Sequence, residues 1–136
     1  MDLTARSVVK DFRKLKVRHK AHVVALDIYR HTNGFPREEL YGITSQMRRA
    51  STSVAANIAE GYGRGGDGDF HRFLSTAAGS AVELEYFLLL ARDLGMLDQT
   101  AYDSLQEQVV ELQRMLSGLL RTVATARQKP LATGIS

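Results

Sequence analysis

The chain has 136 residues, a length that suits one domain with one hydrophobic core. Hydrophobic residues make up 44% and charged residues 24%, the balance of a folded globular protein and not of a disordered one. Cysteine is absent, which excludes disulfides, thiolate metal sites and cysteine nucleophiles and favours a reducing cytoplasm. No signal-type run opens the chain, and the longest apolar stretch, 86–91, is too short to span a membrane. We therefore predict a cytoplasmic protein with no membrane partner.

The first apolar-periodic segment predicts a helix that ends near Thr32, just before Asn33 and Gly34. Its apolar positions recur at helical spacing: Val17, Ala21, Val24, Ala25 and Ile28. Residues 1–14 show no such period, so we predict a basic, mobile arm there. Residues 128–136 likewise predict a flexible C-terminal tail, which leaves residues 15–127 for the folded domain.

The second predicted helix begins after Pro36, because proline is tolerated only at the start of a helix. Glu38 and Glu39 place negative charge at its N-terminus, where the helix dipole favours it. Gly61 or Gly63 ends it. Its apolar stripe comprises Leu40, Ile43, Met47, Ala50, Val54 and Ile58.

The third and fourth predicted helices span about 68–94 and 99–126. Gly95 closes the third helix, and Asp98 is placed to cap the N-terminus of the fourth. The stripe of the third helix comprises Phe70, Phe73, Leu74, Ala77, Ala81, Leu84, Leu88 and Ala91. The stripe of the fourth alternates spacings of three and four and comprises Tyr102, Leu105, Val109, Leu112, Leu116, Leu119 and Val123.

Four helices joined by three short loops predict an all-α fold, an antiparallel up-down-up-down four-helix bundle. Two of the helices carry apolar residues beyond one stripe: Val23, Leu26 and Tyr29 in the first, and Val82, Phe87, Leu89 and Leu90 in the third. A wide stripe facing the core would explain them, and so would a subunit interface.

Residues suited to catalysis or to metal binding do not form a recognisable set. His19 and His22 are spaced to share a helix face, but no Glu-x-x-His pair accompanies them, and we predict no metal or cofactor. The glycine-rich segment 61–66 follows a helix and not a strand, which argues against a dinucleotide site and favours a tight turn. We predict no catalytic residues and no enzymatic activity.

Asn57 falls on the predicted inward face of the second helix, where a polar side chain needs hydrogen-bond partners. Charged residues lie on nearby turns of the second and third helices: Arg48, Arg49, Glu60, Glu83 and Glu85. We therefore predict a structural charge network between these two helices. A binding site is the alternative interpretation of the same residues.

The charge is unevenly distributed along the chain. Residues 1–37 contain nine basic and three acidic residues, a net of +6, so that the remaining residues carry −3 of the total +3. A basic arm that leads into a basic helix could neutralise phosphates and release their counterions. The candidate phosphate contacts are Arg13, Lys14, Lys16, Arg18 and Lys20. A solvated polar face is the alternative, since Phe12 is the only aromatic residue in the arm.

Several short segments follow one another along the chain in a fixed order: Asp11 to Val17, Lys20 to His22, Ile28-Tyr29, Phe35-Pro36, Glu39 to Gly42, Thr44 to Ala50, Asn57 to Gly61, Arg64, Phe73-Leu74, Gly79-Ser80 and Glu83 to Glu85. Together these segments resemble the four-helix-bundle proteins encoded in intervening sequences of bacterial 23S ribosomal RNA genes. They cover about residues 11–121 in the family's order and spacing.

The resemblance implies a homopentamer of antiparallel bundles, which would explain the additional apolar residues. A related branch, the accessory variability proteins of diversity-generating retroelements, binds nucleic acid and a reverse transcriptase through a basic pentamer surface. Arg48, Arg49, Asn57, Glu60, Arg64, Glu83 and Glu85 match the family pattern as structural positions. The leading hypothesis is thus an oligomeric bundle that binds RNA or a ribonucleoprotein, and the alternative is a protein-protein scaffold.

Overall fold

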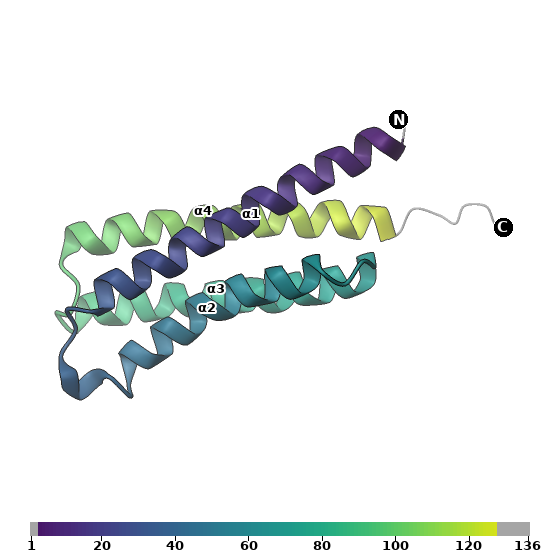
Figure 1. Ribbon diagram of the computed structural model, residues 1–136. Helices are drawn as coiled ribbons and strands as arrows, with labels where there is room; N and C mark the ends of the chain where they lie inside the picture. The colour runs from purple at the N-terminus through teal and green to yellow at the C-terminus, as the bar shows by residue number, and fades with distance from the viewer. Residues whose placement is uncertain (1–2, 128–136) are drawn as a thin grey trace.

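A computed structural model of the protein describes the backbone of residues 3–127 and the side chains of residues 13–124. Four long helices and one short 3-10 helix make up the fold: α1 (Leu3–Thr32), η1 (Arg37–Glu39), α2 (Ile43–Tyr62), α3 (Asp67–Asp93) and α4 (Gln99–Arg127). Consecutive long helices run in opposite directions (Figure 1). Within the described residues there is no strand, and the predicted all-α four-helix bundle is confirmed.

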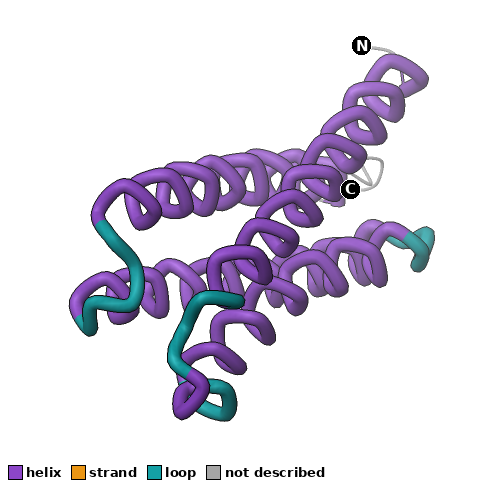
Figure 2. The backbone as a smooth tube through the Cα atoms, turned by 60° about the vertical axis from the view of Figure 1, so that its left-hand side comes forward, coloured by secondary structure: helices purple, strands orange, loops and turns teal. Residues whose placement is uncertain are grey.

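The helices occupy the corners of a square. Helix α1 packs against α2 and α4, and α3 packs against the same two neighbours, whereas the described backbones of α1 and α3 do not come close to each other. In Figure 2, turned from the view of Figure 1, α1 runs obliquely in front of the other helices. Helices α1 and α3 therefore lie at diagonal corners and run in the same direction.

The core is built from the predicted stripes. The stripe of α4 is buried from Tyr102 to Val123, and α3 buries seven residues from Phe70 to Ala91. Two predicted residues are exceptions: Leu40 lies outside the core with 44% of its surface exposed, and Phe73 is only half-buried. Burial of side chains of this size contributes about 1.5–3 kcal/mol each, so the stripes supply the main stabilising term.

Some of the apolar residues outside the main stripes of α1 and α3 face the core, as a wide stripe would, and others lie at the surface, as a subunit interface would require. Phe87, Leu89 and Leu90 are half-buried against the core, which widens the stripe of α3. Val82 is 60% exposed, and Leu26 and Tyr29 are also exposed. The wide-stripe explanation therefore holds for part of the set only, and these three residues form apolar surface.

The N-terminal capping prediction for α4 is confirmed. The backbone N–H of Ala101 donates a hydrogen bond of 2.8 Å to the carboxylate of Asp98. This bond satisfies one of the backbone donors left free at a helix N-terminus. It also fixes the point at which the chain turns from α3 into α4.

Helix α1 begins earlier than predicted. Residues 3–14, expected to lack regular structure, are helical and continue α1 without interruption. The reason is that helix propagation needs good helix formers and no breaker, and neither glycine nor proline occurs before Gly34. An apolar period is needed only where a helix packs. The predicted tail, 128–136, lies outside the described residues.

Helix α2 begins later than predicted, at Ile43 instead of directly after Pro36. The intervening chain forms the single 3-10 turn η1, in which the N–H of Leu40 bonds the carbonyl oxygen of Arg37 at 3.1 Å. Gly42 then redirects the backbone before α2 begins. The exposed position of Leu40 follows from this turn.

Of the two glycines predicted to end the helix, Gly63 does so, whereas Gly61 has a different role. It is buried inside α2, and a Cβ atom there would lie 2.9 Å from the Cβ of Phe73 and 3.0 Å from a ring carbon of Phe70. The helix ends one residue later, at Tyr62, with Gly63 as its cap. Gly61 thus permits α2 and α3 to approach closely at their connected ends.

Substitution of Gly61 by alanine should lower the free energy of unfolding by about 1–3 kcal/mol, because the added methyl group overpacks the α2–α3 contact. Gly118→Ala is the matched control. It lies in the interior of α4, where a Cβ atom would meet only the end of the Arg121 side chain at 3.9 Å, and it should stabilise the protein by up to about 1 kcal/mol. Urea denaturation measures both effects, and equal stabilities would contradict the close contact.

Candidate functional site

The five cations predicted to contact phosphate lie on two sides of α1. Lys14 and Arg18, one helical turn apart, face the connected ends of α2 and α3. The Lys14 ammonium lies 4.4 Å from the centre of the Phe70 ring and 5.5 Å from that of Tyr62, and the Arg18 guanidinium lies 5.5 Å from the Tyr62 ring. These cations stack on aromatic faces, an attractive contact, and so help to hold α1 against α2 and α3.

The other cations lie toward α4 or solvent. Arg13 donates a hydrogen bond of 2.6 Å to Thr122 Oγ1, and the Lys20 ammonium lies 3.4 Å from the carboxylate of Glu111. Lys16 is exposed, as are Arg13 and Arg18. The segment is therefore not a single row of cations along one face of α1, although three of its members remain open to solvent.

The fold gathers further cations at the same end of the bundle. A mid-plane passes near the contacts Ser53–Ser80 and Lys20–Glu111. We define the basic half as the described residues on the side of the α2–α3 loop: 13–20, 56–80 and 114–124. Its basic members outside α1 are Arg64, Arg72, Arg114 and Arg121. With three acidic residues, Glu60, Asp67 and Asp69, against nine basic ones, it carries a net of +6.

The opposite half comprises the described residues 21–55 and 81–113. It holds five basic and ten acidic residues, a net of −5. The described bundle is thus polarised along its length, with a net charge of only +1 in total. Its potential is set by where the fold places the charges and not by the net charge of the chain.

Arg64 belongs to the glycine-rich loop at the tip of the basic half. Its guanidinium pairs with the carboxylate of Glu60 at 2.9 Å and lies 5.3 Å from the centre of the Phe73 ring. Arg72 covers the same ring at 4.4 Å. Gly65 takes a positive φ of 86°, a left-handed conformation that glycine adopts readily. The loop is therefore a tight turn that presents Arg64, next to Arg72 on α3.

The predicted charge network around Asn57 is wrong. Asn57 is half-buried and its amide donates hydrogen bonds within α2, to the carbonyl and hydroxyl oxygens of Ser53 at 2.8 and 3.1 Å. The link from α2 to α3 is a hydrogen bond of 2.8 Å between the hydroxyls of Ser53 and Ser80. Glu85 instead accepts a bond of 2.9 Å from Gln113 on α4. Glu83 is exposed.

Arg48 joins α1 to α2 at the other end of the bundle. It donates hydrogen bonds to Thr32 Oγ1 at 2.9 Å and to Asn33 Oδ1 at 3.1 Å, and its guanidinium lies 4.7 Å from the centre of the Tyr29 ring. The neighbouring Arg49 is exposed. The prediction that Arg48 belongs to a network between α2 and α3 is therefore wrong. Its partners, Thr32 and Asn33, lie on the far side of the loop that joins α1 to α2.

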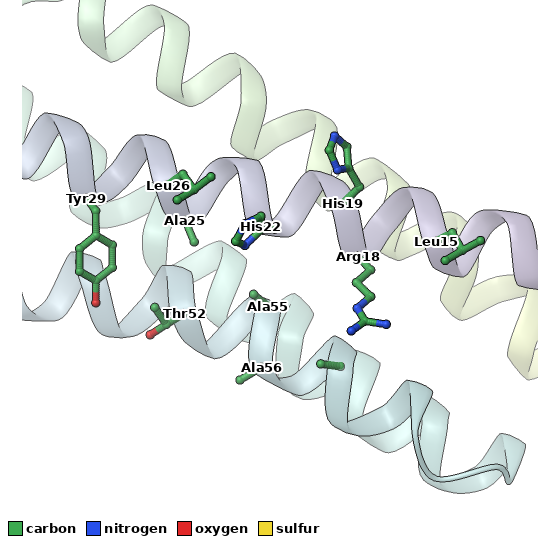
Figure 3. Close-up of a pocket in the computed structure, with 11 residues that line it drawn as sticks. Leu15, Arg18, His19, His22, Ala25, Leu26, Tyr29, Thr52, Ala55 and Ala56 are labelled. Carbon is green, nitrogen blue, oxygen red and sulfur yellow. The ribbon is translucent and has the colours of Figure 1, made fainter.

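An open groove of about 810 Å³ separates the outer faces of α1 and α2 (Figure 3). Its α1 wall includes Leu15, His19, His22, Leu26 and Tyr29, and its α2 wall consists of Thr52, Ala55, Ala56 and Ala59. Both predicted candidate histidines are exposed here. Among the described residues, no group of three potential metal ligands comes together. The groove is thus mainly an apolar surface with small residues on one wall.

Helix α3 has a second notable property. By length and composition it would qualify as a membrane-crossing helix, and 28% of its most apolar window is buried within the described structure. Core helices of soluble proteins also pass this test, but they are mostly buried, whereas most of this window is not, although α3 contributes a full stripe to the core. The small buried share reflects the apolar residues on its outer face.

Replacement of Arg48 by alanine should lower the free energy of unfolding by about 1–3 kcal/mol, because it removes two charge-assisted hydrogen bonds and leaves the buried Thr32 with one partner fewer. Arg49→Ala is the control and should change stability by less than about 0.5 kcal/mol, since its side chain is exposed. Urea midpoints compare the two. Equal losses would show that Arg48 does not join the helices.

Comparisons with known proteins agree with this architecture. The model of the 23S rRNA-intervening sequence protein family matches residues 13–118. A solved structure from Bacteroides thetaiotaomicron, described as a protein of unknown function from the S23 ribosomal protein family, is similar at 24% identity with a TM-score of 0.74. The similarity covers 80% of this chain and 98% of that one. No curated protein matches. The family match spans most of the bundle, and the chain belongs to the 23S rRNA-intervening sequence protein family.

Proposed function

We propose that the protein is a non-enzymatic, oligomeric bundle that binds structured RNA through its basic half. The observation that carries the proposal is the division of charge, +6 in the basic half against −5 in the opposite half. Such a division is a poor way to stabilise a monomer, because like charges at one end repel each other. The same division gives one end of the molecule a positive potential that attracts a polyanion.

Several cations of the basic half are available to phosphates. Arg114 and Arg121 are exposed on α4, one heptad apart, and Arg18 is exposed on α1. Arg64 and Arg72 pair with carboxylates at the surface, but such exposed pairs contribute only about 0–1 kcal/mol. Phosphates could therefore replace these carboxylates at little cost.

The aromatic residues of the basic half favour phosphate contacts over base stacking. Single-stranded nucleic acids are commonly held by bases stacked on open aromatic rings. Here, cations already cover the rings of Tyr62, Phe70 and Phe73. Recognition by backbone charge and shape is typical of double-stranded RNA. The family takes its description from the 23S rRNA intervening sequence, which refers to where its members are encoded and not to a ligand, so RNA as the polyanion is part of the proposal.

Self-association would strengthen such a surface. The family resemblance implies a pentamer, and five basic halves on one side of a ring would bring about +30 of charge together, from +6 in each described chain. The absence of an enzymatic role is part of the proposal. It rests on the structural contacts of three polar residues: Asn57 donates within α2, Ser80 bonds α3 to α2, and Arg48 joins the end of α1 to α2.

The experiment is filter binding of structured RNA across a salt titration. Arg114→Glu with Arg121→Glu should weaken binding at least tenfold at low salt. It should also reduce the slope of log K against log salt concentration by about 1.4–1.8, for two lost phosphate contacts. Arg37→Glu with Arg49→Glu is the matched control, with the same change in charge at exposed positions of the opposite half.

The control variant should bind RNA nearly as well as the unchanged protein. No binding at low salt, or equal weakening by both variants, would contradict the basic half as an RNA surface. If the protein copurifies with a stoichiometric amount of another protein and without nucleic acid, the alternative function, a protein-protein scaffold, would be favoured.

A further inference from the structure

We propose that the basic half binds a double-stranded RNA stem on the adjoining outer sides of α1 and α4. We name this surface the α1–α4 face, and its cations are Arg13, Lys16, Lys20, Arg114 and Arg121. The inference rests on the RNA binding proposed above. It deepens that proposal, because it names the side of the basic half that contacts RNA and the kind of RNA that is contacted.

The charge of the basic half is concentrated on two of its four helices. The segments of α1 and α4, residues 13–20 and 114–124, hold seven basic residues and no acidic one, a net of +7. The segment of α2 and α3, residues 56–80, holds two basic and three acidic residues, a net of −1. A polyanion is therefore attracted to the side of the basic half that α1 and α4 form, and not to the glycine-rich loop at its tip.

Two contacts fix the register of α1 against α4. The Arg13 guanidinium donates a hydrogen bond of 2.6 Å to Thr122 Oγ1, and the Lys20 ammonium lies 3.4 Å from the Glu111 carboxylate. Lys16 lies one helical turn from both Arg13 and Lys20, so it shares their side of α1. The cations on this side of α1 therefore border α4 between the levels of Glu111 and Thr122.

The cations of α4 lie within the same levels. Arg114 follows Glu111 by three residues and Arg121 follows Arg114 by seven, and both arginines are exposed. At a rise of about 1.5 Å per residue, the two arginines lie about 10.5 Å apart along α4, as do Arg13 and Lys20 along α1. Packed helices lie about 8–10 Å apart. The α1–α4 face is thus a patch of two short rows of cations, one row on each helix.

The density of these cations matches a double helix better than a single strand. A nucleic-acid double helix carries about one negative charge per 1.7 Å of its axis, and each strand about one per 3.4 Å. A length of about 10.5 Å therefore contains about six phosphates of a duplex but only about three of one strand. The five cations of the face suit the two phosphate rows of a duplex.

The side chains of the α1–α4 face favour phosphate contacts over base contacts. Residues 13–20 and 114–124 include no aromatic residue, so these segments offer no ring on which an unpaired base could stack. Among the described residues of α4, no large apolar side chain is exposed. Double-stranded RNA is recognised mostly through its shape, its phosphates and its 2′-hydroxyl groups. The face therefore suits a duplex bound without sequence preference.

The other cations of the basic half face elsewhere or pair with carboxylates. The Lys14 ammonium and the Arg18 guanidinium each lie 5.5 Å from the centre of the Tyr62 ring, and Figure 3 shows Arg18 extending from α1 toward α2. Arg64 and Arg72 each form an ion pair within their own segment. These four cations add to the positive potential but lie outside the two rows.

Three double variants test the face, and each removes two positive charges from the basic half. Arg13→Gln with Lys16→Gln neutralises the row on α1, Arg114→Gln with Arg121→Gln neutralises the row on α4, and Arg64→Gln with Arg72→Gln neutralises the loop end. All six positions are exposed, so circular dichroism should find every variant helical. The probe is an RNA duplex of about 16 base pairs, compared with each of its strands alone by fluorescence anisotropy.

The unchanged protein should bind the duplex about tenfold or more tightly than either strand at the same salt concentration. Each row variant should weaken duplex binding about tenfold or more and lower the salt slope by about 1.4–1.8, for two lost phosphate contacts. The loop variant should weaken it less than about threefold, since its arginines lie beside carboxylates. Arg37→Gln with Arg49→Gln, at exposed positions of the opposite half, is the control and should bind like the unchanged protein.

The possible failures are distinguishable. Absence of binding to the duplex and to both strands at low salt would overturn the proposed RNA binding together with this face. Strands that bind as tightly as the duplex would overturn the preference for double-stranded RNA alone. Row variants without effect, or a loop variant that binds as weakly as they do, would overturn the α1–α4 face and leave the basic half as an RNA surface.

Discussion

Burial of one apolar stripe from each of four helices is the interaction on which the rest of this structure depends. The stripes are long, rich in leucine and alanine, and almost fully excluded from solvent. Once they are buried, helical geometry decides where every other residue lies. Lys14 and Arg18 flank the stripe of α1 toward Tyr62, whereas Arg13 and Lys20 flank it toward α4. The division of charge along the bundle and the exposed apolar residues on its outer faces are thus consequences of core packing.

Much of this could be predicted from the sequence, because heptad spacing and capping are local signals. The stripe of α4 and the Asp98 cap are examples. Contacts between distant segments could not be predicted in the same way. Arg48 reaches Thr32 and Asn33 across a loop, and Asn57 finds its partner one turn away in its own helix. A single sequence shows which polar groups need partners, but the partner depends on how the helices are rotated.

The candidate site likewise has one part that local sequence signals predict and another that depends on the fold. The basic segment of α1 is evident from the sequence, yet its union with Arg114 and Arg121 of α4 requires the antiparallel order of the helices. The excess of +6 in residues 1–37 is therefore one part of a larger asymmetry. The exposed apolar residues Val82 and Tyr86 of α3, and Leu26 and Tyr29 of α1, are not separable by periodicity from a wide core stripe, because they too lie at helical spacing. Exposure in the folded chain separates them.

Attraction of a polyanion by the basic half is the central claim, since the division of charge follows directly from core packing. The most direct measurement is the salt dependence of the affinity for structured RNA. The account predicts an affinity that falls steeply as the salt concentration rises, and a smaller slope once Arg114 and Arg121 are replaced by glutamate. An affinity that does not depend on salt, or a slope that the same replacement leaves unchanged, would contradict it.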